Sequence, residues 1–124
     1  MKNKKVYISS AFTTGWQIHN MRNQMLMAYE LKKLGYLPFI PLLFPFFEFA
    51  VGNQFSDREM LDWELEYIGV CDFLVRVRFK DSNGAEIPSS GADEEVATAK
   101  KAGIPVYVFN SIEEMVKYFK GYKL

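Results

Sequence analysis

Two glutamates occupy positions where a helix normally turns apolar side chains toward a sheet. Glu95 follows Ala92 by three residues and precedes Ala99 by four, so the three share one face of a helix expected near 90–103. Burying an unpaired carboxylate costs free energy, and the start of a helix offsets part of that cost by favouring the ionised form. An ionised, sheltered carboxylate at this position could serve as a covalent nucleophile.

Glu64 repeats the pattern on the preceding helix. It follows Leu61 by three residues and precedes Ile68 by four, so it shares their inward face. Two inward carboxylates from the helices on either side of one strand could act as nucleophile and proton donor in glycosyl chemistry. The alternative is structural, because acids that cap a loop or pair with a lysine also occupy such positions.

The elements that must position these acids alternate between strand and helix. Apolar runs predict strands at 6–10, 36–41, 72–78 and 104–109. Helical periodicity, caps and terminal glycines predict helices at 17–34, 56–70, 90–103 and 111–121. This order predicts one α/β domain over residues 1–124, a flavodoxin- or Rossmann-like three-layer sandwich with a mainly parallel sheet of four to five strands. Ligands of such sheets bind past the carboxyl ends of the strands, beside the loops expected at 9–16, 42–56, 79–90 and 109–112.

The segment 42–55 is unusually apolar, with five phenylalanines interrupted by Pro45 and Gly52. It is too apolar for a free loop, so it either folds over the core as a lid or meets another subunit. Pro38 and Pro41, in the strand before it, place that strand at an edge of the sheet.

Composition limits the class of function. The 15 basic and 15 acidic residues give no net charge, which argues against a sequence-independent grip on a nucleic-acid polymer and against a charged membrane-surface role. The prolines in the longest apolar stretch, 36–47, exclude it as a membrane span. Cys71 and His19 are the only residues of their kinds, so no metal site is expected. A lone thiol without a signal peptide predicts a cytoplasmic location.

The sequence around Glu95 resembles a known enzyme family. Residues 89–99 are Ser-Ser-Gly-Ala-Asp-Glu-Glu-Val-Ala-Thr-Ala, and Gly-Ile-Pro-Val follows at 103–106. This pattern is similar to that of the nucleoside 2-deoxyribosyltransferase superfamily, which includes the small 2′-deoxynucleoside 5′-monophosphate N-glycosidases. In that pattern a glycine stands four residues before the nucleophilic glutamate, and Gly-x-Pro-Val begins the next strand. The resemblance covers most of the chain and implies that Glu95, four residues after Gly91, is the nucleophile.

Two further matches imply catalytic roles. The segment from Glu64 to Asp72 resembles a family segment with aspartate at both ends, the first of which handles the nucleobase or its proton. Glu64 would take that role, although its side chain is one methylene longer. Tyr7, on the first strand, matches a tyrosine that lies near the nucleophile, where it would orient Glu95 by a hydrogen bond.

The resemblance also implies the substrate class. Transferases often carry an acid at the position of Ser89, whereas the monophosphate glycosidases carry serine, which favours hydrolysis or a phosphorylated substrate. The arginine that those glycosidases carry after the first strand is missing, with Thr13 nearby instead. The expected activity is retaining cleavage or transfer of the N-glycosidic bond of a (deoxy)nucleoside or nucleoside 5′-monophosphate, without metal or cofactor. The residues expected to bind substrate are Ser9, Ser10, Thr13, Asp72, Ser89 and Gly91.

The family forms oligomers whose sites are completed by a neighbour, so the resemblance implies a homodimer or larger homo-oligomer. Two other classes of function stay open. A non-catalytic nucleotide-binding module could keep the pocket without turnover, and glutamate in place of aspartate at position 64 keeps this alternative open. Flavin binding is the other alternative, because Thr13-Thr14-Gly15 is similar to a flavodoxin-type phosphate loop, but it leaves Glu64 and Glu95 unexplained.

Overall fold

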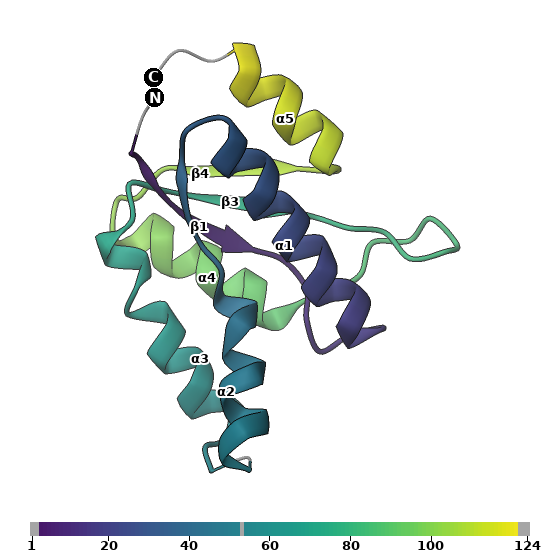
Figure 1. The fold of residues 1–124 in the computed structure, drawn as a ribbon, viewed down its shortest axis with the longest axis vertical. Helices are drawn as coiled ribbons and strands as arrows, with labels where there is room; N and C mark the ends of the chain where they lie inside the picture. The colour runs from purple at the N-terminus through teal and green to yellow at the C-terminus, as the bar shows by residue number, and fades with distance from the viewer. Residues whose placement is uncertain (1–2, 53, 122–124) are drawn as a thin grey trace.

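The computed structural model of the protein describes residues 3–52 and 54–121, and for residues 43–46 it describes the backbone alone. Within these residues a four-stranded, all-parallel sheet lies between layers of helices (Figure 1). The strands are β1 (Lys5–Ser9), β2 (Leu37–Phe39), β3 (Phe73–Val77) and β4 (Val106–Phe109), in the order β2-β1-β3-β4. The α/β sandwich predicted from the alternating pattern is confirmed, and β2 is an edge strand as its proline predicts.

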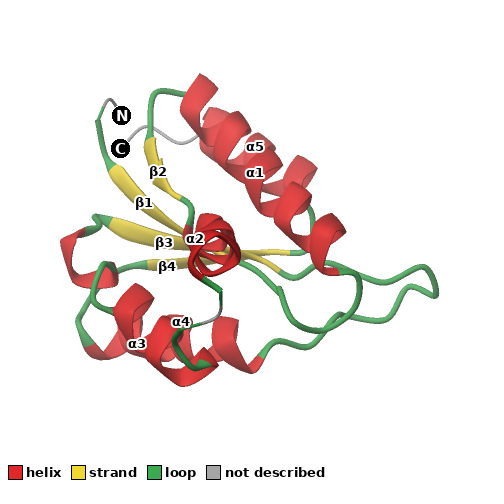
Figure 2. Cartoon of the chain, turned by 60° about the horizontal axis from the view of Figure 1, so that its bottom comes forward, coloured by secondary structure: helices red, strands yellow, loops and turns green. Residues whose placement is uncertain are grey.

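Five α-helices are present in the described residues. They are α1 (Gln17–Lys33), α2 (Phe44–Val51), α3 (Asp57–Leu65), α4 (Ser90–Lys101) and α5 (Ile112–Gly121), with 3₁₀ turns at Pro41–Leu43 and Ile68–Val70. Figure 2 shows α1 and α5 on one face of the sheet and α3 and α4 on the other. None of the described helices is both long enough and apolar enough to cross a bilayer.

Strand β1 serves both faces of the sheet because successive side chains alternate across a strand. Val6 and Ile8 are fully buried in the larger apolar core, which α1 and α5 cover. Tyr7 and Ser9, also fully buried, point to the other face, toward α4. The strand therefore carries two polar side chains into the layer in which Glu95 was expected.

Helix α3 begins as predicted and ends earlier. Ser56 and Glu59 form the expected capping box, with Glu59 N–H donating to Ser56 Oγ at 3.1 Å and Ser56 N–H donating to Glu59 Oε1 at 3.0 Å. The prediction that this helix continues to residue 70 is wrong, because α3 ends at Leu65 and a 3₁₀ turn follows. The sequence Ile68-Gly69-Val70 in that turn combines glycine with two β-branched residues, and all three have a lower α-helix propensity than alanine or leucine.

The phenylalanine-rich segment is largely helical rather than a loop. Pro45 falls in the first turn of α2, where its missing N–H removes no hydrogen bond, and Gly52, at φ +78°, ends the helix. Phe47 packs edge-on against Trp63 of α3, with ring centroids 5.4 Å apart, so α2 lies against α3. Phe49 is 90% exposed. The side chains of Phe44 and Phe46, which belong to the predicted apolar segment, lie outside the described residues.

Candidate active site

Glu95 is held against the sheet by hydroxyl groups from β1. It lies in the second turn of α4, and its side chain is only 5% exposed. Tyr7 Oη donates a hydrogen bond of 2.5 Å to Glu95 Oε2, and Ser9 Oγ donates one of 2.8 Å to Oε1. Both carboxylate oxygens are therefore fixed by neutral donors. The influence of a helix start fades beyond its first turn, so these hydroxyls, rather than the start of α4, compensate for the burial of Glu95.

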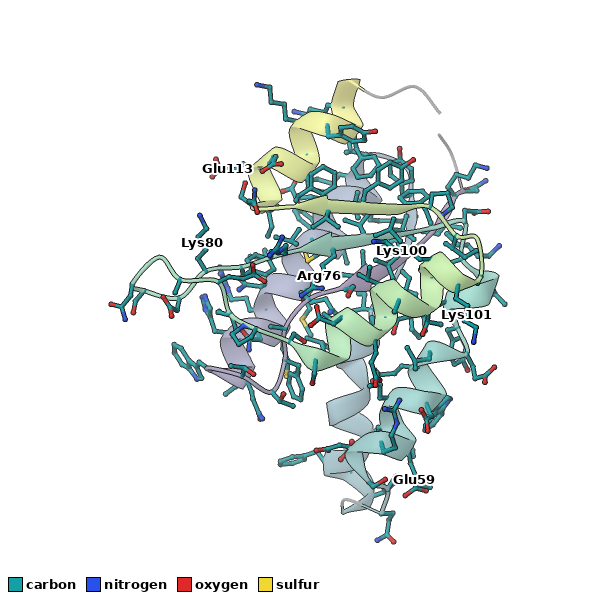
Figure 3. All side chains as sticks on the ribbon, turned by 180° about the vertical axis from the view of Figure 1, so that it is seen from behind. Glu59, Arg76, Lys80, Lys100, Lys101 and Glu113 are labelled. Atoms are coloured by element: carbon teal, nitrogen blue, oxygen red, sulfur yellow. The ribbon has the colours of Figure 1, made fainter. Side chains whose placement is uncertain are left out.

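Opposing influences set the pKa of Glu95 near neutrality. The pKa of Glu95 rises from 4.5 to about 7, because burial raises it by more than the hydrogen bonds from Tyr7 and Ser9 and the charge of Arg76 lower it. Arg76, labelled in Figure 3, belongs to β3. It stands beside Ser9 in the sheet register, and its Nη1 donates to Asp93 Oδ1 of α4 at 2.6 Å. Burial and the neighbouring Glu95 raise the pKa of Tyr7, so its hydroxyl keeps its proton and remains a donor.

A cavity of about 250 Å³ opens beside Glu95. Its wall brings together the loop after β1, α1, the segment after β2, α3 and the start of α4. This place is past the carboxyl ends of β1 and β3, where the strand order changes direction, as predicted for the fold. The lining residues are Ser10, Phe12, Thr13, Gln24, Leu42, Glu48, Asp57, Met60, Leu61, Glu64, Ser89, Ser90, Gly91, Ala92 and Glu95.

Glu64 reaches this cavity from α3. Burial, then the charges of Glu95 and Glu48, raise the pKa of Glu64 to about 8, so it holds its proton at neutral pH. Arg58 links the helix of Glu64 to that of Glu95: its Nη1 bonds Glu94 Oε1 at 2.9 Å across the gap between α3 and α4. The two acids share one cavity, and both have pKa values raised toward neutrality, about 7 for Glu95 and about 8 for Glu64, which suits acid–base roles.

The structure brings most of the residues expected from the sequence to this cavity. Ser10, Thr13, Ser89 and Gly91 line the wall with the two glutamates. Ser89 is also the N-cap of α4, because its Oγ accepts the Ala92 N–H at 3.1 Å. Tyr7 and Ser9 do not line the wall and instead contact Glu95 from behind.

Asp72 is not brought to the cavity. It directly precedes β3, and its Oδ2 accepts the backbone N–H of Lys5, the first residue of β1, at 2.7 Å. In parallel strands all amino ends meet at one edge of the sheet and all carboxyl ends at the other, so Asp72 lies at the edge away from the cavity. The expectation that Asp72 binds substrate from the same cavity is corrected, and its observed contact is structural.

Gln24 is a cavity residue that the sequence analysis missed. It is 1% exposed on α1, its Nε2 donates to Ser10 Oγ at 3.1 Å, and its Oε1 accepts the Leu42 N–H at 2.9 Å. The criterion that identified Glu95 would have found it, because Gln24 precedes the buried Ala28 by four residues and Leu31 by seven.

The wall of the cavity is acidic. Glu48 and Asp57 line it together with Glu64 and Glu95, and among the described lining residues none is basic. Glu48 and Asp57 also line an adjoining open hollow, with Phe12, Thr13, Gln17, Phe49 and Gly52. The described parts of the chain contain no group of three or more histidine, cysteine, aspartate or glutamate residues placed to hold a metal ion.

No protein-family model and no curated protein sequence matches this chain. The similarity to the nucleoside 2-deoxyribosyltransferase superfamily therefore rests on the residues themselves. One of its implications concerns geometry: a tyrosine on the first strand was expected to contact Glu95, and Tyr7 donates to it. The helical spacing of the two glutamates separately predicted that they lie near a common cleft, and both line one cavity.

Proposed function

We propose that this protein cleaves or transfers the N-glycosidic bond of a nucleoside, with Glu95 as nucleophile and Glu64 as proton donor. The observation that carries the proposal is the environment of Glu95, namely its hydrogen-bond donors and the second acid in the same cavity. Both of its carboxylate oxygens are held by buried hydroxyls, and it lines a cavity with a second acid whose raised pKa keeps it protonated. A retaining glycosidase requires such a pair, with one ionised carboxylate as nucleophile and one protonated carboxyl group as general acid.

The reaction runs in two steps. A Glu95 carboxylate oxygen attacks the anomeric carbon, the C–N bond breaks, and its electron pair leaves with the base, which takes the proton of Glu64. The product is a glycosyl ester on Glu95. Water or a second base then attacks the same carbon, its proton passes to the Glu64 carboxylate, and Glu95 leaves again as a carboxylate. Tyr7 and Ser9 hold Glu95 in place throughout.

The charge of the cavity favours an uncharged nucleoside over a nucleoside 5′-monophosphate. Four carboxyl groups line the wall and no described lining residue is basic, so a phosphate would meet the start of α4 without a cationic side chain beside it. Ser89, the residue shared with the monophosphate glycosidases, uses its Oγ to cap α4. The same charge distribution disfavours the phosphate of a flavin nucleotide.

The test is release of free base. The protein is incubated with purine and pyrimidine deoxynucleosides and with their 5′-monophosphates, with and without an acceptor base, and the products are separated by chromatography. We expect free base from nucleosides with the wild type and none with Glu95→Ala. Asp72→Asn is the matched control, because it changes a carboxylate away from the cavity and should retain the activity.

A glycosyl adduct on Glu95, trapped with a slow substrate analogue and located by mass spectrometry, would establish the covalent step. Equal traces of base from wild type and Glu95→Ala would contradict catalysis. If both proteins still bound nucleoside under those conditions, the chain would be the non-catalytic binding module. Release from monophosphates alone would overturn the preference for uncharged substrates.

A further inference from the structure

The amide of Gln24 has a fixed orientation. Its two ends meet Ser10 Oγ and the backbone N–H of Leu42, and the side chain is 1% exposed. A backbone N–H can only donate, so the amide oxygen must face Leu42, and the amide nitrogen must face Ser10. The hydrogen-bond network thus determines which end of the Gln24 side chain donates.

This orientation sets the polarity of Ser10. Since Ser10 Oγ accepts from Gln24 Nε2 at 3.1 Å, its own proton must point elsewhere. Ser10 is 5% exposed and lines the cavity, and among the described residues no acceptor receives that proton. Because buried polar groups are normally hydrogen-bonded, this hydroxyl is a donor available to a ligand in the cavity.

We propose that Ser10 donates a hydrogen bond to an oxygen of the substrate's sugar, and that Gln24 is the positioning residue that imposes this direction. The sugar is the part of the ligand concerned because its anomeric carbon must reach Glu95, and Ser10 directly follows Ser9, which contacts Glu95. The inference rests on the proposed function and specifies how the same site recognises its ligand.

Reversing the direction of the Ser10 hydrogen bond tests the proposal. Gln24→Glu keeps the shape of the side chain, and an ionised carboxylate still accepts from Leu42 N–H. It has no proton to give, so it takes the proton of Ser10, which then offers only lone pairs to the ligand. The dissociation constants of 2′-deoxyinosine and 2′-deoxycytidine are measured by calorimetry in a Glu95→Ala background, which prevents turnover.

Ser10→Ala should weaken the binding of both nucleosides about threefold to tenfold, as expected for one neutral hydrogen bond. Gln24→Glu should weaken binding by a similar factor alone and by almost nothing when combined with Ser10→Ala. The loss caused by Gln24→Glu should also shrink from about pH 9 to about pH 6, because a protonated carboxyl can again donate to Ser10. Each ratio is taken against the parent at the same pH, because the charge of Glu64 on the same wall also changes with pH.

Equal losses from Gln24→Glu with and without the Ser10 hydroxyl would overturn the proposal, since charge or misfolding would then explain them. If Gln24→Glu does not fold, the hydrogen bond between Gln24 and Ser10 can still be tested by nuclear magnetic resonance without ligand. The side-chain amide resonance of Gln24 should shift in Ser10→Ala, and an unchanged resonance would contradict the hydrogen bond. If that resonance shifts but neither nucleoside binds, the proposed function fails, and the sugar as acceptor fails with it.

Discussion

Tyr7 and Glu95, 88 residues apart in the chain, share a hydrogen bond of 2.5 Å in the buried layer between β1 and α4. The contact ties β1 to α4, the helix that carries the acid. It gives Glu95 a donor that stays protonated, because burial and Glu95 itself raise the pKa of Tyr7.

Removing the Tyr7 hydroxyl should make Glu95 harder to ionise. The hydrogen bond from Tyr7 lowers the pKa of Glu95, so Tyr7→Phe should move the acidic limb of the rate profile to higher pH. Base release near pH 6 should fall about threefold to tenfold, with a smaller loss at high pH. Rates measured across pH check this, with Tyr29→Phe, an exposed tyrosine on α1, as the control. A loss of the same size at every pH would contradict the assignment.

The wild-type rate should peak between about pH 7 and about pH 8, because Glu95 must be ionised while Glu64 must be protonated. Glu64→Gln should abolish the alkaline limb and reduce base release about a hundredfold or more. The loss should be smaller for substrates whose base departs without protonation. Glu66→Gln, an exposed neighbour, is the control. An unchanged alkaline limb in Glu64→Gln would assign that limb to another group.

The two buried acids should make the fold less stable as pH rises. Their folded-state pKa values, about 7 for Glu95 and about 8 for Glu64, lie above the ordinary 4.5, so the folded protein binds more protons than the unfolded chain between those limits. The free energy of unfolding should therefore decrease from about pH 5 to about pH 8. Urea denaturation at several pH values measures this slope. The double variant Glu64→Gln/Glu95→Gln should flatten it, and an unaltered slope would refute the linkage.

Arg76 should act on Glu95 through space. Its charge lowers the pKa of Glu95, although it contacts Asp93 and does not line the cavity. Arg76→Gln should therefore move the acidic limb of the rate profile to higher pH with little change in the limiting rate. Arg78→Gln is the matched control, because Arg78 follows two residues later and pairs with Glu86. Identical profiles for both variants would show that the charge of Arg76 has no influence on Glu95.

The sequence predicted the elements whose patterns are local. Alternating apolar runs and caps placed the four strands and the start of α3, and the position of Glu95 on an apolar helix face identified it as a buried acid. The early end of α3 was missed because Glu64, Leu65 and Ile68 continue the helical spacing through a turn that Gly69 weakens. Helix α2 was missed because Pro45 was taken as a breaker, although proline is tolerated in a first turn.

Contacts between distant residues could not be predicted from local patterns. The partner of Gln24 is the backbone of Leu42, and the neighbour of Ser9 in the sheet is Arg76, so both relations depend on how the strands are ordered. The resemblance anticipated the contact of Tyr7 with Glu95. It also led to Asp72, whose place at the amino edge of the sheet follows from strand direction.

The alternation of side chains along β1 has a consequence for how this chain can vary. Val6 and Ile8 anchor the larger core, while Tyr7 and Ser9 hold Glu95. A register shift of one residue in this strand would place the hydroxyls in the apolar core and the aliphatic side chains against the carboxylate of Glu95. Loops around the cavity can accept inserted residues without changing this alternation. An insertion or deletion of one residue inside the five residues of β1 would instead disrupt the core and the environment of Glu95 together.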